Sequence, residues 1–322
     1  MKPIKIYFED FWEGFNVENN FIMNLLRNEY EIILDEKPDY LFFSVYGYNH
    51  LKYRNCIKIF YSAENIEPDF NLCDYAMAFQ HLNAGDRYLR YPLYVDSGFE
   101  KIENKHFEPD KVLNRKFCNF VYSNSKWADP IREVFFNKLS KYKKVDSGGY
   151  YLNNIGGTVA NKIDFIKDYK FTIAFENSSL SGYTTEKLVD PMTVNSMPIY
   201  WGNPDIHLDF SKESIIFVND YSTLDETIEE VIRLDKDDEA YIEKLSKPWC
   251  NGTLYAGWRS QLLSFLKNIF EQEIGKAKRT TAYGFVRTYR RKQETMGWLS
   301  NRKIMRFTIF NKEFELLVGT KK

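Results

Sequence analysis

The stretch FTIAFENSSLSGYTTEKLVDPMTVNSMPIYWGNPDI, residues 171–206, changes character four times along the chain. It begins as an apolar, strand-like run, passes through a Ser/Gly loop into a helix-like segment, and returns to an apolar strand that ends in Gly-Asn-Pro. This alternation is typical of an α/β domain with a parallel sheet. Because ligands of such sheets collect at the carboxyl ends of the strands, we expect a binding site where the first strand ends.

The loop between this strand and the helix carries the residue types that such a site needs. Glu176 and Asn177 end the strand, and Gly182 permits a tight turn before the helix. Either Thr184 or Thr185 can cap the helix through its hydroxyl. The main-chain N–H groups of the first helical turn would then point toward the strand end.

Glu186 and Lys187 fall in the first turn of this helix. A carboxylate there is favoured by the helix dipole, but a lysine there is disfavoured by a few tenths of a kcal/mol. The lysine either points to solvent or helps to bind an anion whose attraction outweighs that cost. We favour the anion, and a diphosphate is the obvious candidate because it combines high charge with many acceptor oxygens.

The composition is that of a folded, nearly neutral protein. The 322 residues are 44% apolar and 17% aromatic, and the net charge is −1. This balance supports a buried core and argues against binding to nucleic acid. No run of 18 apolar residues occurs, and Glu9, Asp10 and Glu13 occupy the place of a signal-peptide core, so we expect a cytoplasmic protein.

The cysteines and histidines form no metal or disulfide pattern. The four cysteines lie far apart without a CxxC pair, and the four histidines show no HExxH spacing, so we expect free thiols and no bound metal. A DxD pattern occurs within DKDD, residues 235–238, but it follows the helix-like run LDETIEEVIRL rather than a strand. We interpret it as part of a solvated helix face.

Short apolar runs alternate with helix-like segments in both halves of the chain. The expected strands cover 4–8, 40–46, 56–62, 75–79, 117–123 and 214–219; the expected helices cover 19–28, 129–142, acidic segments up to about 247, and 258–274. An asparagine starts the first helix, and Asp129 and Pro130 suit the N-cap and first position of the second. The pattern predicts two α/β units with parallel sheets.

The end of the chain is electrostatically distinct. Residues 276–322 carry 13 Lys and Arg against 3 Asp and Glu. A basic segment there precedes a predicted short hairpin centred near Asn311 and Lys312. This tail either packs on the protein as a solvated extension or contacts an anionic membrane, which would attract each exposed basic side chain by about 1 kcal/mol.

The opening stretch resembles the donor-binding signature of the bacterial α-1,3-fucosyltransferases of glycosyltransferase family 10. The resemblance extends to FYSAENIEPDFNLCDYAMAF (60–79), DRYLRYPLY (86–94) and FCNFVYSN with DPIREVFFNKLSKY (117–142). It covers roughly residues 35–220, with several motifs in the same order as in the family.

The resemblance implies a GT-B architecture of two Rossmann-like domains. Residues 1–110 would bind the acceptor, 111–275 would bind GDP-fucose, and 276–322 would form a basic tail. The implied reaction is inverting transfer of fucose to the 3-hydroxyl, or 4-hydroxyl, of an N-acetylglucosamine or glucose unit, as in Lewis-type antigens. The acceptor would be an oligosaccharide or a lipid-linked glycan, with no cofactor required and a divalent metal at most stimulatory. Some relatives have a basic C-terminus thought to touch the membrane, so the tail could hold this protein at the inner face of the cytoplasmic membrane.

The resemblance also assigns residues to roles. The position of the family's catalytic base falls on Glu64 in YSAEN, and donor contacts fall on Arg132, Asn177, Tyr183, Glu186 and Lys187, with Glu176 as a further candidate. These residue types suit the chemistry. One carboxylate can take the acceptor proton, while Arg132 and Lys187 stabilise the charge on the departing GDP.

Alternatives remain for several of these residues. Taken alone, Glu64 would be a solvated loop acid, Arg132 a surface arginine, and Glu176 only an anchor for its loop. The glycine-rich SGGYYLNNIGG, residues 147–157, fits no phosphate-binding pattern and reads equally as a mobile connector near the site. The chain could also use another nucleotide sugar, or be a non-catalytic glycan-binding protein with a degenerate site.

Overall fold

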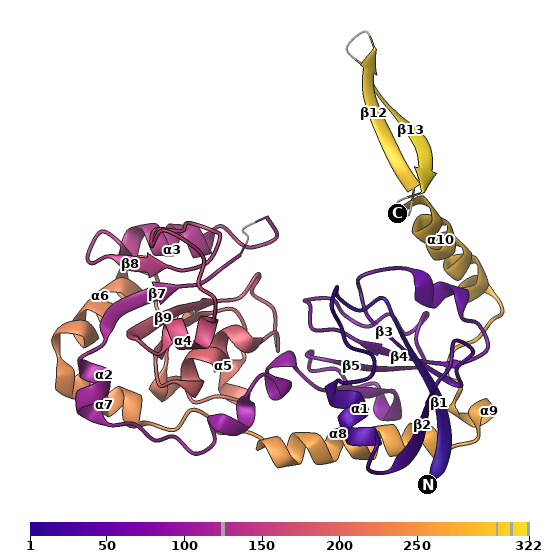
Figure 1. The fold of residues 1–322 in the computed structure, drawn as a ribbon, viewed down its shortest axis with the longest axis horizontal. Helices are drawn as coiled ribbons and strands as arrows, with labels where there is room; N and C mark the ends of the chain where they lie inside the picture. Colours follow the sequence, from indigo (N-terminus) through magenta and orange to yellow (C-terminus); the bar gives the residue numbers. More distant parts are fainter. Residues whose placement is uncertain (124–125, 301, 310–311, 321–322) are drawn as a thin grey trace. The chain divides into compact units, whose positions relative to one another are not determined.

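In a computed structural model, the chain forms two compact units, each built around its own sheet (Figure 1). The structure describes residues 1–123, 126–300, 302–309 and 312–320, with side chains up to residue 300. The first unit comprises Met1–Ala78, Asn83–Leu89 and Leu262–Lys322. The second comprises Phe79–Leu82 and Arg90–Gln261.

The first unit contains a six-stranded sheet in the order β2-β1-β3-β4-β5-β6, in which β1 to β5 pair in parallel. Its strands are β1 (Lys2–Glu9), β2 (Tyr30–Leu34), β3 (Tyr40–Phe43), β4 (Ile57–Tyr61), β5 (Tyr75–Ala78) and β6 (Tyr88–Arg90). The predicted strands at 4–8, 40–46, 56–62 and 75–79 are confirmed. Strand β2 was not predicted, because it is an edge strand in which only Tyr30 is buried, so it lacks an apolar signature.

Helices α1 (Phe21–Leu26), α9 (Ile274–Ala277) and α10 (Phe285–Ser300) belong to this unit, together with the C-terminal half of α8 (Tyr255–Phe270). The predicted asparagine cap is confirmed, since the Asn20 side chain accepts hydrogen bonds from the main-chain nitrogens of the first turn of α1. The ring of Phe270 in α8 packs edge-on against Tyr40, at 4.6 Å between centroids. The α10 segment was expected only as a basic stretch, not as a helix.

The second unit contains a five-stranded parallel sheet in the order β11-β10-β9-β7-β8. Its strands are β7 (Lys116–Phe120), β8 (Val145–Ser147), β9 (Tyr169–Phe175), β10 (Met197–Trp201) and β11 (Ile216–Phe217). All seven residues of the central strand β9 are buried, so helices cover both faces of the sheet. The opening sequence stretch therefore contributes the central strand, the helix beside it and the next strand, as predicted.

The helices of this unit are α2 (Pro109–Leu113), α3 (Ile131–Leu139), α4 (Lys162–Ile166), α5 (Glu186–Thr193), α6 (Leu224–Lys236) and α7 (Asp238–Ser246). Pro130 has helical dihedral angles, and the Asp129 side chain accepts a hydrogen bond from Ile131 N at 2.9 Å. This agrees with the predicted cap at Asp129. The DxD segment spans the junction of α6 and α7, with only Asp237 between the two helices.

The bounds of the two units differ from the expected boundaries at 110 and 275. Residues from Arg90 onward belong to the second unit because Tyr91 and Tyr94 pack against Trp258 within that unit. Residues from Leu262 onward belong to the first unit, and the tail after 275 is not a separate body. Asp74 is fully buried in the first unit and accepts hydrogen bonds from the main-chain nitrogens of Arg279 and Thr280, which ties the tail to β5.

The chain ends in an antiparallel hairpin of β12 (Arg302–Ile309) and β13 (Lys312–Thr320), which confirms the predicted hairpin. Its predicted centre at Asn311 lies outside the described residues, and Lys312 is the first residue of β13. In the part of the chain that the structure describes, no helix combines the length and apolar character needed to cross a bilayer.

Candidate active site

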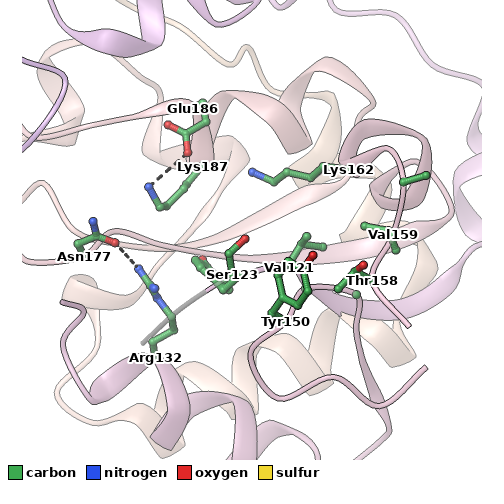
Figure 2. Close-up of a pocket in the computed structure, with 14 residues that line it drawn as sticks. Val121, Ser123, Arg132, Tyr150, Thr158, Val159, Lys162, Asn177, Glu186 and Lys187 are labelled. Atoms are coloured by element: carbon green, nitrogen blue, oxygen red, sulfur yellow. Dashed lines mark hydrogen bonds and ion pairs between the residues drawn. The ribbon is translucent and has the colours of Figure 1, made fainter. Parts of the chain in front are cut away.

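A cavity of about 530 Å³ opens at the carboxyl ends of strands β7, β8 and β9 in the second unit (Figure 2). This is the place expected for a ligand of a parallel sheet, and the size suits a small-molecule ligand. Its lining comes from the segments after the three strands and from the starts of α3, α4 and α5. The lining residues are Val121, Tyr122, Ser123, Arg132, Gly148, Gly149, Tyr150, Thr158, Val159, Ala160, Lys162, Asn177, Glu186 and Lys187.

Helix α5 begins at this cavity with Thr185 as its N-cap. The Thr185 hydroxyl accepts a hydrogen bond from Lys187 N, which confirms the expected cap, and Gly182 has φ +79° in the turn before it. A side chain at Gly182 would also place a Cβ 2.5 Å from Phe79 O, so both conformation and space require glycine. The main-chain N–H groups of Glu186 and Lys187 therefore lie at the cavity wall.

Lys187 points into the protein rather than to bulk solvent, with 17% of its side chain exposed. Its ammonium lies 3.5 Å from the Glu176 carboxylate and 3.3 Å from the Glu186 carboxylate. Burial disfavours the charged form, but the two carboxylates outweigh that effect and raise the pKa of Lys187. The cation that the sequence places at an unfavourable helix end is thus kept charged by neighbouring carboxylates.

Glu176 is fully buried and does not line the cavity. Its two carboxylate oxygens accept hydrogen bonds from Thr185 N at 2.7 Å and from the Thr185 hydroxyl at 2.8 Å. Burial raises the pKa of Glu176, with Lys187 and the Thr185 hydrogen bonds acting in the opposite direction. Glu176 therefore fixes the start of α5 through Thr185 and stabilises the charge on Lys187.

Arg132, in the first turn of α3, is 3% exposed and reaches the end of β9. Its Nη2 donates hydrogen bonds to Phe175 O and to the Asn177 side chain, both at 3.0 Å, and its guanidinium lies 4.0 Å from the centre of the Tyr122 ring. Its Nε is buried without a hydrogen-bond partner in the described structure. Arg132 is therefore fixed by its neighbours and keeps a donor unused.

The glycine-rich segment forms one wall of this cavity. A Cβ on Gly149 would lie 1.9 Å from Tyr122 O, and one on Gly148 would lie 2.7 Å from Val159, so larger residues cannot be accommodated without movement. Asn153 and Asn154 cross-link the segment through hydrogen bonds to Gly149 O and to Ser147 N. The segment therefore lies beside the site, where the sequence analysis placed it. Hydrogen bonds from its own asparagine side chains stabilise it.

Lys162 and Tyr150 are among the cavity residues that the sequence did not identify as site residues. Lys162 begins α4 after the N-cap Asn161, and its Nζ donates to Asp190 at 2.7 Å. The argument applied to Lys187, a cation at a helix start, could have identified it. Tyr150 lines the cavity with 77% of its surface exposed, and no local pattern distinguishes it from Tyr151.

Besides Glu176, two predicted site residues lie outside the cavity lining. Tyr183 is 2% exposed, packs against Phe79 at 5.0 Å between ring centroids, and does not line the cavity. Glu64 belongs to the first unit, in the loop after β4, where its carboxylate accepts a hydrogen bond from the Tyr46 hydroxyl at 2.8 Å. The structure thus brings together Arg132, Asn177, Glu186 and Lys187.

The DxD segment has structural roles. Asp235 is largely buried, with 5% of its side chain exposed, and accepts a hydrogen bond from the Tyr142 hydroxyl at 2.9 Å. Asp237 caps α7 through its side chain, so only part of the segment fits the expected solvated face. Within the described residues, no three His, Cys, Asp or Glu side chains are grouped as metal ligands.

The cavity can hold an anion. Arg132, Lys162 and Lys187 contribute three cations, whereas Glu186 is the single acidic residue among the lining residues. Burial opposes ionisation of Glu186, but Lys187 and Lys162 outweigh it and lower its pKa. A diphosphate would meet these cations at the start of α5, the positive end of that helix.

Comparisons with known proteins agree with this architecture. Residues 6–96 match the model of the α-(1,3)-fucosyltransferase FucT N-terminal domain, and residues 112–251 match that of the glycosyltransferase family 10 (fucosyltransferase) C-terminal region. The chain is 32% identical over 320 residues to the α-(1,3)-fucosyltransferase FucT of Helicobacter pylori, with 84% of this chain aligned. It spans 66% of the length of that relative.

Solved structures give the same result. A crystal structure of an α1,3-fucosyltransferase superimposes with a TM-score of 0.75 and 31% identity, over 84% of this chain and 91% of that one. A crystal structure of an α1,3-fucosyltransferase with GDP-fucose gives 0.73 and 30%, over 85% and 92%. The two parallel sheets with their helices form a GT-B fold, and the chain belongs to glycosyltransferase family 10, the fucosyltransferase family.

Proposed function

We propose that this chain transfers L-fucose from GDP-fucose, with inversion, to the 3-hydroxyl or 4-hydroxyl of an N-acetylglucosamine or glucose unit, as in N-acetyllactosamine. The observation that carries the proposal is the cationic cavity of Arg132, Lys162 and Lys187 at the strand ends. It lies within the 112–251 match to the family 10 C-terminal region, and related structures hold GDP and GDP-fucose.

In this proposal the cavity holds the diphosphate of the donor. As the bond between the fucose anomeric carbon and the phosphate oxygen breaks, its electron pair leaves on GDP. The charge that develops there meets Lys187 and Arg132, whose geometry is already fixed by Glu176, Glu186 and Asn177. Groups fixed before the reaction stabilise developing charge without first having to reorganise.

Glu64 is the proposed base on the acceptor side. It would take the proton of the acceptor hydroxyl as the new bond to the anomeric carbon forms. A reaction with inversion is a single displacement, so it needs one such base. The Tyr46 hydroxyl and Ser62 hold the Glu64 residue, through its carboxylate and its main chain respectively. This leaves the second carboxylate oxygen available for the proton.

Glu176 and Tyr183 are assigned supporting roles. Glu176 orients Lys187 and the start of α5, and Tyr183 packs beneath the Gly182 turn against Phe79. Neither touches the cavity, so replacing either should act on the donor site through Lys187 or through the turn.

The test is turnover of GDP-fucose with N-acetyllactosamine and with its type 1 isomer. Glu64→Gln should lower kcat by about 10² to 10⁴-fold, the range for loss of a general base, while GDP affinity is retained. Glu67→Gln, an exposed acid in the same loop, is the matched control and should keep full turnover. Equal effects of the two substitutions would remove Glu64 from the role of base.

Competition between nucleotides separates this function from its alternatives. GDP should inhibit turnover and UDP should not, if the donor is GDP-fucose. Inhibition by UDP would indicate a transferase for another nucleotide sugar. Glycan binding without turnover of any nucleotide sugar would indicate a non-catalytic glycan-binding protein.

A further inference from the structure

The first unit contains a second cavity, of about 370 Å³, that the proposed reaction does not use. It lies between β4 with its neighbouring loops and the basic segment 278–294, which includes the first half of α10. Its lining residues are Leu51, Tyr53, Arg54, Asn55, Lys58, Leu72, Lys278, Thr280, Ala282, Tyr283, Arg287, Arg290, Arg291 and Glu294.

This lining is strongly cationic. Six of its residues are lysine or arginine and one, Glu294, is acidic. Glu294 is already engaged, because both its carboxylate oxygens accept hydrogen bonds from Arg54 at 2.9 and 3.1 Å. Among the described residues, Arg287 and Arg291 have no acidic partner within ion-pair distance.

Lys58 is the most deeply buried of these cations, with 9% of its surface exposed, in the middle of the sheet on β4. Within the described chain, no hydrogen bond or ion pair reaches its ammonium group. The nearby Asp74 is committed elsewhere, since it binds Lys278, Thr280 and the main-chain nitrogen of Lys58.

A buried ammonium without a counter-ion is costly, so such a group is found where something else supplies the negative charge. Burial lowers the pKa of Lys58 to about 8, with Cys56 and Asp74 opposing and Lys278 and Arg290 reinforcing the change. An anion in the cavity would reverse this effect by pairing with Lys58 directly.

We propose that this cavity is a phosphate-binding site, with Lys58 at its base and Arg287, Arg290 and Arg291 around its opening. Arginine and lysine together suit the several oxygens of a phosphate or diphosphate. Leu51, Leu72 and Ala282 provide an apolar wall for an organic part of the ligand. The phosphate could be that of a soluble ester or the headgroup of a lipid. This site is separate from the donor cavity and does not depend on the proposed transferase activity.

The test measures pyrophosphate binding by calorimetry to the full chain without nucleotide, because GDP is itself a diphosphate and would compete at both cavities. Lys58→Met should weaken pyrophosphate binding by about tenfold or more, as expected for loss of a charge-assisted contact. Lys52→Met is the control, because Lys52 is an exposed lysine of the same unit that does not line the cavity. Turnover with a soluble disaccharide should be unchanged in both variants.

A second arm identifies the source of the phosphate. Flotation with phosphatidylcholine vesicles, with and without phosphatidylglycerol, is compared for the same variants. A loss of binding to the anionic vesicles in Lys58→Met but not Lys52→Met assigns the site to a lipid headgroup. Binding of pyrophosphate alone assigns it to a soluble ester.

Two results would overturn the proposal. One is pyrophosphate binding that Lys58→Met leaves unchanged, together with vesicle binding that is also unchanged in Lys58→Met. The other is an equal loss of binding in Lys58→Met and Lys52→Met. Should Lys58→Met fail to fold, Arg287→Gln with Arg291→Gln provides the same test from the exposed rim. That pair of substitutions should weaken pyrophosphate binding without altering the thermal midpoint of the unliganded protein.

Discussion

A buried lysine lines each of the two cavities, but the surroundings shift the pKa of the two lysines in opposite directions. In the second unit, Lys187 lies within 3.5 Å of two carboxylates, which raise its pKa. In the first unit, Lys58 has no carboxylate partner among the described residues, and burial lowers its pKa to about 8. Lys187 is therefore a permanent cation held ready for its ligand, whereas the charge on Lys58 depends on what enters the cavity.

Among the substitutions that test this comparison of the two cavities, Lys187→Met should have the largest effect. It should lower kcat/KM for GDP-fucose by about 10² to 10³-fold, as for removal of one preorganised transition-state donor. It should also reduce the free energy of unfolding by about 3 to 5 kcal/mol, because Glu176 is left buried without its cation. Steady-state kinetics and urea unfolding measure the two effects.

Lys162→Met is the matched control, because Lys162 lines the same cavity but is 31% exposed and pairs with one carboxylate, that of Asp190. Its stability change should be smaller than that of Lys187→Met, because only one partly exposed ion pair is lost. If Lys187→Met destabilised the protein no more than Lys162→Met, the ion pairs of Lys187 with Glu176 and Glu186 would not contribute to stability.

Lys58→Met should change stability in the opposite direction from Lys187→Met. It should increase the free energy of unfolding of the unliganded protein by about 2 to 4 kcal/mol at pH 7. The ordinary pKa of 10.5 applies to the unfolded chain and about 8 to the folded one, so the penalty is full below pH 8. It is relieved as the pH rises from 8 to 10.5, where the folded lysine is already neutral. Urea unfolding of both proteins at pH 7 and pH 10 measures the difference.

Four titratable groups surround Lys58 and can contribute to the same pH dependence. They are Cys56, Asp74, Lys278 and Arg290, and burial also raises the pKa of the Cys56 thiol. Because that thiol can lose its proton in the alkaline range, Cys56→Ser in the same series separates its titration from that of Lys58. A stability gain that persists unchanged at pH 10 would contradict the assignment to Lys58.

The two cavities also differ in how far the sequence could predict them. The donor cavity depends largely on one continuous stretch, so the strand end at Asn177, the turn at Gly182 and the cation at Lys187 could be located from local rules. The burial of Tyr183 could not be predicted, because local rules do not distinguish a buried ring from an exposed one. The second cavity is lined by both Lys58 and Arg287, which are distant in sequence. No local pattern indicates that α10 lies near β4.

Glu176→Gln should have a smaller effect than Lys187→Met. The amide oxygen can still accept from Thr185, but the negative charge that supports Lys187 is lost. We expect a loss of about 1 to 3 kcal/mol in stability and a lower pKa for Lys187. The decline in kcat/KM should therefore grow as the pH rises, whereas the wild type should show no such decline up to about pH 9. An identical pH profile for the two proteins would show that Glu176 acts only as an anchor for the loop.

The smallest expected effect is that of metal removal. The donor cavity presents Arg132, Lys162 and Lys187 to a diphosphate, which are the charges that a divalent cation would otherwise provide. EDTA should therefore change turnover of GDP-fucose by less than about threefold, a change that corresponds to under 1 kcal/mol. The informative comparison is with Lys187→Met, in which one of the three charges is absent. If Mn²⁺ stimulates that variant more than the wild type, the protein's own cations and the metal are interchangeable at the diphosphate. Complete loss of wild-type turnover in EDTA, restored by Mn²⁺, would contradict this prediction. It would mean that Arg132, Lys162 and Lys187 do not suffice without a metal. The donor cavity would then need a bound cation, just as the proposed Lys58 site needs a bound anion.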